Sequence, residues 1–470
     1  MIAFAMHQPL PRKSLSSIWP VGHIREIRRD MLAYFTRCAQ ECGDIALMRF
    51  GPRNVFLLSH PDHIEQVLVA RNRAYSKHYA FKFLRPLLGQ GLLTAEGDHW
   101  LRQRRLMQPA FARDALAQYA AVMVDYAEEM VATWSDGEER DIEHEVTELT
   151  LRIAAKTLMD IDLGEQLSIV SHGTDAMTDD FRRRFQSIAQ LPRWLPTPNN
   201  RRSDRDLKQL DGVIEGIIAA RRKSSEDHGD LLSLLMQARD EDDGRGMSDK
   251  QLRDEVMTLL LAGHETTANA LSWTWYLLAQ HPRVETKLLA ELDEVLGGRA
   301  PTMDDLPRLA YTEQIVKESM RLYPPAYTVG REAIEDTQIG NFKVPRGTTV
   351  FMSQWVVHHD NRWYDEPEKF APERWTAEFE RTRPKYAYFP FGGGPRVCIG
   401  NTFAMIEATL LVAAIAQRYR FRLASDEPVI PWAAVTLRPR HGIPMLLYKR
   451  EEQAKSGGRQ KSAAASSGSE

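Results

Sequence analysis

A glycine-rich segment in the last quarter of the chain carries one cysteine to the start of an apolar stretch. It reads Phe391-Gly392-Gly393-Gly394-Pro395-Arg396-Val397-Cys398-Ile399-Gly400. Backbone N–H donors stabilise a metal-bound thiolate such as a ligand of haem iron, and positive φ at Gly394 and Gly400 would let the main chain approach a porphyrin. Phe391 is suited to shield the sulfur from water, and Arg396 to bind a propionate through charge-assisted hydrogen bonds. For a Gly-Gly-Gly stretch taken alone, a turn with a buried cysteine is the commoner outcome.

A second unusual group of side chains reads Ala262-Gly263-His264-Glu265-Thr266-Thr267. Glycine and threonine are disfavoured inside helices, yet this group falls in the middle of a helical pattern. A Thr266 hydroxyl bonded to a carbonyl one turn earlier would loosen the helix and open a local groove. Ala262 and Gly263 would leave room for a flat cofactor. A helix-packing seam of small residues explains these two residues but leaves the acid, Glu265, unexplained.

The helix that must carry this group has recognisable ends. Ser248 and Gln251 form a capping-box pattern, and Pro282 closes the other end. About 33 residues lie between these ends, a rod of roughly 50 Å at ~1.5 Å per residue. A helix of that length crosses a whole domain. The apolar run from Thr402 to Gln417 predicts another helix directly after the cysteine segment.

Charged residues at helical spacing supply candidate braces and anion-binding groups. Glu318 and Arg321 lie at i and i+3 on one helix face, where a carboxylate can be shared by Arg321 and Arg374. Trp100 and Arg104 lie at i and i+4, so both offer donors on one helix face. Each pair taken alone is explained equally well by exposed surface charge.

These segments follow one another in an order that resembles the cytochrome P450 superfamily, from about Gly43 to Leu447. The cysteine segment matches the family pattern FxxGxRxCxG at every fixed position. Four further segments match the family's WxxxR, AGx(D/E)T(T/S), ExxR and PERF patterns, the last with Trp in its final place. They are Trp100 to Arg104, Ala262 to Thr267, Glu318-Ser319-Met320-Arg321 and Pro372-Glu373-Arg374-Trp375.

The resemblance implies a role for each of these residues. Cys398 is expected to be the axial ligand of the iron of haem b, a thiolate that favours O–O cleavage. Glu265 and Thr266 are expected to manage protons, and His264 is not expected to bind iron. The residues expected to brace the cysteine segment are Glu318, Arg321 and Arg374. Those expected to contact the haem are Trp100, Arg104, Arg331, Arg396, Phe391, Gly400 and Ala262. Those expected to line the substrate pocket are Phe81, Phe83, Leu84, Ala326 and Val329.

The resemblance also implies the fold, one mostly α-helical domain with a small β region, over about residues 1–450. Residues 451–470 contain no aromatic or β-branched side chain and predict a disordered low-complexity tail. Too few residues follow Cys398 for a fused reductase, so a separate ferredoxin or flavodoxin with its reductase is expected to supply electrons. Its docking surface is expected around Arg102, Arg105 and Arg113, although such a run is usually only a solvated face.

Composition restricts the partners and the compartment. The net charge of −3 and the pI near 6.6 argue against binding to nucleic acid. No apolar run approaches the ~20 residues that span a bilayer, so no membrane anchor is expected. Three cysteines, Cys38, Cys42 and Cys398, indicate a reducing compartment rather than a disulfide framework. The expectation is a cytoplasmic monomer.

The expected function is that of a monooxygenase, an oxidoreductase that uses O2 and two electrons. It would hydroxylate or epoxidise a lipophilic molecule such as a fatty acid or a terpenoid. A peroxide-driven haem peroxygenase is one alternative, but it would not need the pair Glu265 and Thr266. A haem sensor or carrier without turnover is another. A sensor would more naturally carry an added signalling domain, and none is visible in the sequence.

Overall fold

The computed structural model describes residues 22–50, 53–185, 194–223, 229–240 and 244–450. Most of these residues are helical. The α-helices are α1 (Ile24–Arg29), α2 (Met31–Cys42), α3 (Pro61–Glu65), α4 (Arg85–Leu88), α5 (Gly97–Met107), α6 (Arg113–Ala132), α7 (Ile142–Met159), α8 (Leu167–Phe185), α9 (Pro198–Lys223), α10 (Leu231–Gln237), α11 (Asp249–Gln280), α12 (Pro282–Leu296), α13 (Ala310–Leu322), α14 (Gln354–His358), α15 (Ala377–Thr382) and α16 (Asn401–Arg418).

The strands are short and form small sheets. They are β1 (Ile45–Phe50), β2 (Arg53–Leu58), β3 (Tyr75–Lys77), β4 (Glu139–Asp141), β5 (Val329–Ala333), β6 (Thr337–Ile339), β7 (Phe342–Val344), β8 (Thr349–Met352), β9 (Tyr419–Leu423), β10 (Pro431–Ala433), β11 (Leu437–Pro439) and β12 (Pro444–Lys449). The largest sheet has the order β1-β2-β8-β5-β3, in which only β2 and β8 are parallel. β10 and β11 form a hairpin, and β9 pairs with β12, which also pairs with β4.

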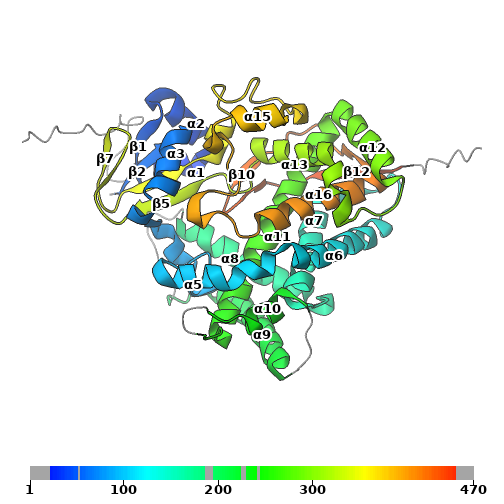
Figure 1. Ribbon diagram of the computed structural model, residues 1–470, viewed down its shortest axis with the longest axis horizontal. Coiled ribbons are helices and arrows are strands. Elements are labelled where there is room, and N and C mark those ends of the chain that lie inside the picture. Colours follow the sequence, from blue (N-terminus) through cyan, green and yellow to red (C-terminus); the bar gives the residue numbers. More distant parts are fainter. Residues whose placement is uncertain (1–21, 51–52, 186–193, 224–228, 241–243, 451–470) are drawn as a thin grey trace, which may run out of the picture.

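The sheet and the helices occupy different parts of the molecule. Figure 1 shows β1, β2 and β5 with α1, α2 and α3 at one side, whereas helices form most of the remainder, with β12 near α12 at the opposite side. In the same view α11 lies centrally, with α9 and α10 below it and α12 and α13 above. The expected architecture, mostly α with a small β region, is therefore confirmed.

The long helix begins and ends where the sequence predicts. Ser248 is the N-cap of α11, and its side chain and that of Gln251 make the two reciprocal bonds of a capping box. The helix stops at Gln280, and Pro282 begins α12. Proline suits the first turn of a helix because the N–H it lacks has no intrahelical partner there.

α11 joins two clusters of buried apolar side chains, and the cluster changes partway along it. Residues up to Leu261 pack with α7, α9 and α10, whereas residues from Ala268 onward pack with α6, α12, α13 and α16. The six residues between, 262–267, belong to neither apolar cluster. The small and polar group noted in the sequence therefore marks the point where the helix leaves one core and enters the other.

Three other sequence expectations concern the remaining cysteines, the C-terminal tail and membrane-spanning helices. Cys38 is buried on α2 and Cys42 is half-buried at its end. The expected tail, 451–470, lies outside the described residues. None of the helices that the structure describes is both long enough and apolar enough to cross a membrane.

Candidate active site

The cysteine segment turns sharply before α16, and one glycine makes this turn possible. Gly394 has φ +66°, and a Cβ there would lie 1.8 Å from the carbonyl oxygen of Leu68. Any larger residue at position 394 would push the cysteine segment away from the backbone of Leu68. The expectation of positive φ at Gly400 is wrong, because that residue caps α16 with φ −93°. A Cβ on Gly400 would meet Phe111 at an ordinary 3.6 Å.

The thiol of Cys398 is surrounded by protein and yet keeps accessible surface. Burial raises its pKa, while the Gly400 N–H and the nearby Arg104 oppose that rise. A side chain that is surrounded by protein atoms and still has accessible surface lines an internal cavity. The Cys398 N–H donates to the Phe391 carbonyl at 3.0 Å, which fixes the loop around the sulfur. A backbone donor and a cation aimed at sulfur are what a metal-bound thiolate requires, so the site fits a haem iron ligand.

The middle of α11 is accessible although the turns on either side of it are buried. Ala262 is exposed, and Glu265 and Thr266 are partly exposed. A Cβ added to Gly263 would meet nothing within 4 Å. The Thr266 hydroxyl donates to the Ala262 carbonyl at 2.7 Å, the bond expected from the sequence. Its hydrogen is thereby used, and its oxygen can accept a hydrogen bond from a ligand.

His264 points away from this accessible face. It is buried, and its Nδ1 lies 2.7 Å from the Leu260 carbonyl on its own helix. The carbonyl of His264 accepts a hydrogen bond from Thr150 of α7 at 3.1 Å. The expectation that His264 is not a metal ligand agrees with this position.

Glu265 turns toward elements outside α11. Its carboxylate accepts hydrogen bonds from Thr436, in the turn between β10 and β11, at 2.6 Å and from Thr178 of α8 at 3.3 Å. Neither threonine is apparent from the sequence, because neither lies in a motif and each is far from Glu265 along the chain.

A cluster of cations lies beside the cysteine segment, and among the described residues the acids that act on it are Glu96 and Glu255. Lys77 of β3 and Arg331 of β5 are paired across the sheet, and Arg396 lies close to both. Burial, with Arg396 nearby, lowers the pKa of Arg331 to about 10. Burial likewise lowers the pKa of Lys77 to about 7, with Arg396 adding to the effect and Glu96 opposing it.

The charge of this cluster fits a dianionic group. The Arg331 guanidinium donates to the adjoining Gly330 carbonyl at 3.0 Å, and no carboxylate of the described residues lies at hydrogen-bonding distance from it. A buried cation without a close acid is costly, and two propionates would neutralise the excess. Lys77 was missed from sequence because it matches no motif, and only its register opposite Arg331 reveals it.

The two other expected haem contacts on arginine already have protein partners. Arg396 is ion-paired with Glu96, and its guanidinium stacks 4.4 Å from the centre of the Trp100 ring. Arg104 donates to the carbonyl of Val397 at 2.8 Å, next to the cysteine. Arg104 therefore braces the cysteine segment from α5, and its charge opposes the rise in the pKa of the Cys398 thiol that burial causes.

Glu318 is the centre of a fully buried polar network. Its two oxygens accept from Arg321 twice at 2.9 Å, from Arg374 at 2.9 Å and from the Ala371 N–H at 3.1 Å. A fifth bond, at 2.9 Å, comes from the indole N–H of Trp375. Trp375 occupies the place where the sequence departs from PERF, and a phenylalanine there could not donate this bond. The network ties α13 to the segment before the cysteine loop.

Comparison with known proteins agrees with the interpretation of Cys398 as a haem iron ligand. The sequence profile of the family described as Cytochrome P450 matches residues 11–443. The chain belongs to the cytochrome P450 family. Its members are haem-iron monooxygenases, so this chain is an oxidoreductase that acts on O2 with a haem cofactor.

Bacterial P450s are similar to this chain over most of their lengths. It is 41% identical to "Cyclooctatin synthase" and 37% identical to "Cyclooctat-9-en-7-ol 5-monooxygenase", both from Streptomyces melanosporofaciens. The alignments cover 89% and 86% of this chain and 90% and 87% of those proteins. "Pentalenene oxygenase" of Streptomyces avermitilis is 35% identical over 89% of this chain and 92% of its own.

Solved P450 structures share the fold. A crystal structure of the cytochrome P450DA haem domain superposes with a TM-score of 0.85 at 26% identity, covering 94% of this chain and 99% of that one. A cyanobacterial P450 solved with retinoic acid bound gives a TM-score of 0.84 at 26% identity, covering 94% and 100%.

The expected substrate-pocket residues of this P450 divide into two groups. Phe81, Phe83, Ala326 and Val329 are partly exposed and could offer apolar surface to a ligand. Leu84 is 4% exposed and packs in the core. The prediction that Leu84 lines the pocket is therefore wrong: the resemblance gave its position along the chain but not the direction of its side chain.

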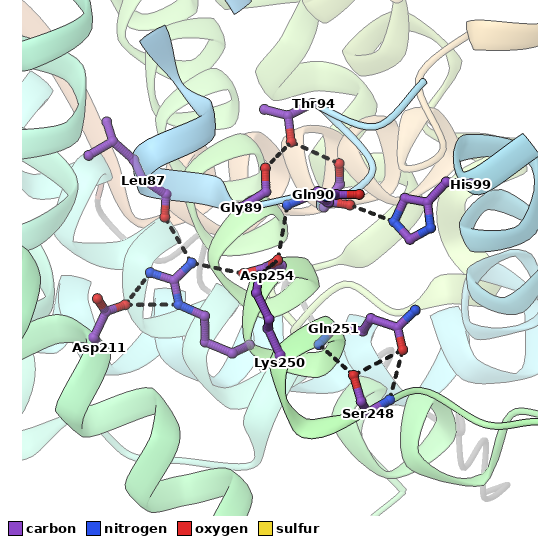
Figure 2. A network of polar contacts seen from close by, with 12 residues as sticks. Leu87, Gly89, Gln90, Thr94, His99, Asp211, Ser248, Lys250, Gln251 and Asp254 are labelled. Atoms are coloured by element: carbon purple, nitrogen blue, oxygen red, sulfur yellow. Dashed lines mark hydrogen bonds and ion pairs between the residues drawn. The ribbon is translucent and has the colours of Figure 1, made fainter. Parts of the chain in front are cut away.

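The segment between α4 and α5 is anchored to the first turns of α11, as Figure 2 shows. Asp254 accepts the N–H of Gln90 at 2.9 Å. Its neighbour Arg253 is ion-paired with Asp211 of α9 and donates to the Leu87 carbonyl at 2.9 Å. One arginine thus connects α9, α11 and the segment that follows the aromatic residues.

The basic surface expected to receive a redox partner is partly neutralised. Arg102 and Arg105 both lie close to Asp240, at 3.3 and 3.6 Å. Arg113, at the start of α6, is exposed and makes no ion pair with the described residues. The expectation that these three arginines form one basic patch is therefore corrected, because two of them are bound to an acid of this chain.

Proposed function

We propose that this P450 hydroxylates or epoxidises a polycyclic terpenoid, with O2 and with electrons from a separate ferredoxin or flavodoxin and its reductase. The observation that carries the substrate class is the similarity to bacterial enzymes named for cyclooctat-9-en-7-ol and pentalenene. The partly exposed apolar residues Phe81, Phe83, Ala326 and Val329 are consistent with it. A fatty acid is the weaker candidate because none of these named relatives acts on one by name.

The chain's own residues hold the cofactor in this proposal. Haem b, when bound, supplies the redox chemistry that activates dioxygen. Cys398 binds its iron through a thiolate stabilised by the Gly400 N–H and the charge of Arg104. Lys77, Arg331 and Arg396 together, with one of their charges balanced by Glu96, would neutralise its two propionates, and Trp100 supports Arg396 by stacking.

Thr266 and Glu265 direct protons in this proposal. Because the Thr266 hydrogen is bound to the Ala262 carbonyl, its oxygen acts first as an acceptor that holds a protonated group or a water in place. Glu265 takes up a proton from bulk water and passes it to the water held by the Thr266 oxygen, which returns Glu265 to its carboxylate form. The accessible surface at Ala262 leaves room for the small molecules involved.

The first experiment tests the substrate class and the electron source. The haem-loaded protein is titrated with cyclooctat-9-en-7-ol, pentalenene and myristic acid while the Soret band is followed. Turnover is then measured with NADPH, a surrogate ferredoxin and its reductase, and separately with hydrogen peroxide. We expect a Soret shift and NADPH-dependent product with a polycyclic terpenoid. A response to myristic acid alone would overturn the substrate class, and product with peroxide alone would establish a peroxygenase. A Soret shift without product from either source would indicate a sensor or carrier.

The second experiment tests the proton path. Thr266→Ala should leave the reduced-CO spectrum intact while the ratio of product to NADPH falls several-fold, because oxygen is reduced without productive protonation. Thr274→Ala is the matched control: it removes a hydroxyl that makes the same bond one turn back on α11, to Ala270 at 2.7 Å, in a buried position. A parental ratio in Thr266→Ala would refute the path.

A further inference from the structure

The carboxylate of Glu265 is held by side chains from two distant elements. Thr436 lies in the turn of the β10–β11 hairpin and donates to one carboxylate oxygen at 2.6 Å, a length typical of a charge-assisted hydrogen bond. Thr178 of α8 reaches the other oxygen at 3.3 Å. No hydrogen bond links the side chains of Glu265 and Thr266 in the described structure, although the two residues are adjacent.

The direction of the Thr436 bond is set by a third residue. Asn269, one turn after Glu265 on α11, donates its side-chain amide to the Thr436 hydroxyl at 3.1 Å and to the Glu265 carbonyl at 2.8 Å. Thr436 is 7% and Asn269 3% exposed, so water does not compete for these groups. Because the amide can only donate here, it occupies a lone pair of the hydroxyl and leaves the hydroxyl hydrogen for Glu265.

Thr178 holds Glu265 less firmly. A hydroxyl has one hydrogen, and that of Thr178 is shared between Glu265 at 3.3 Å and the Thr174 carbonyl of its own helix at 3.2 Å. Both distances are long for O–H donors. The bond from α8 can therefore be lost at little cost, whereas the bond from the hairpin is short and directed.

We propose that Thr436 is a positioning residue for the reaction: its hydroxyl, oriented by Asn269, holds the Glu265 carboxylate in the place from which it delivers protons toward Thr266. This inference rests on the proposed function and adds a residue that no motif contains. The β10–β11 hairpin thereby becomes part of the proton path. Because the bond to Thr178 is weak, the Glu265 carboxylate can turn about the oxygen that Thr436 holds.

The test compares Thr436→Val with Thr436→Ser. Valine keeps the shape of the side chain and removes the donor, whereas serine keeps the donor. We expect Thr436→Val to lower kcat about tenfold, with substrate affinity and the reduced-CO spectrum unchanged, since a hydrogen bond to a charged group is worth about that factor. Thr436→Ser should restore most of the rate. Thr274→Val, which removes a buried hydroxyl elsewhere on α11, is the matched control.

Two further measurements separate positioning from a general structural effect. In a Glu265→Gln background, Thr436→Val should cause no further loss of kcat, because its only route to the reaction is removed. In the haem-loaded protein without substrate, the infrared carboxylate band assigned by Glu265→Gln should shift in Thr436→Val and not in Thr274→Val. An unshifted band, or equal losses in both backgrounds, would overturn the proposal. The infrared result holds whichever substrate the enzyme accepts, so it is independent of the proposed function.

Discussion

Replacing Glu318 by glutamine should destabilise the fold and reduce haem retention rather than slow the chemistry alone. The carboxylate is fully buried and accepts five hydrogen bonds, two of them at one oxygen and three at the other. An amide has a single acceptor oxygen. Whichever way the amide is placed, at least two bonds are lost and an N–H2 group faces donors of Arg321, Trp375 or Arg374.

The size of the effect follows from burial and charge. Arg321 is also fully buried, and it would lose its counter-charge. Removing one partner of a buried ion pair costs on the order of 3–5 kcal/mol. That is a large part of the roughly 5–15 kcal/mol by which domains are stable. Arg321 keeps its bonds to the carbonyls of His358 and Pro367, at 2.8 and 2.7 Å, so the variant should still fold partly.

The assay is denaturant unfolding of haem-loaded protein, followed by circular dichroism, together with the haem-to-protein ratio after purification. Glu380→Gln is the matched control. Glu380 of α15 is 41% exposed and pairs at 2.8 Å with Lys317, which lies on α13 as Glu318 does. That surface pair should contribute about 0–1 kcal/mol. If Glu318→Gln retained full haem and lost no more stability than the control, the reasoning about the buried network would be refuted.

Three further changes have distinct expected results. Cys398→Ala should abolish the red-shifted reduced-CO band that sulfur ligation produces, while Cys38→Ser should leave it unchanged; a surviving band in Cys398→Ala would disprove thiolate ligation. Burial raises the pKa of Glu407 to about 8, so the folded protein keeps a proton that the unfolded chain releases. The contribution of Glu407 to stability is complete below its ordinary pKa of 4.5 and is lost as pH rises through about 8. In Glu407→Gln the free energy of unfolding should therefore fall less steeply with pH over that range. An unchanged slope would contradict this. Asp211→Asn should speed amide hydrogen exchange both in α9 and around residues 84–90, because Arg253 holds both; faster exchange in α9 alone would show that the two are not coupled.

Short-range chemistry in the sequence was enough to identify the main elements of the site. The capping box at Ser248 and the proline at 282 determined the ends of α11, because helix termini are governed by bonds within three or four residues. The positive φ expected at Gly394 is present, although the contact with Leu68 that also requires glycine there lies far away in the chain. The motif around Cys398 could be recognised because its fixed residues all lie within ten consecutive positions.

The tertiary structure decided which distant groups meet, and these could not be read from spacing. Thr436 reaches Glu265, Trp375 reaches Glu318, and Lys77 lies opposite Arg331, in each case through packing of elements far apart in the chain. The sequence patterns also failed where a residue's environment sets its role: Leu84 lies in the core, and Gly400 needs no positive φ. Local patterns report the backbone within a few residues, whereas burial, charge balance and hydrogen-bond partners depend on the three-dimensional contacts of the folded chain.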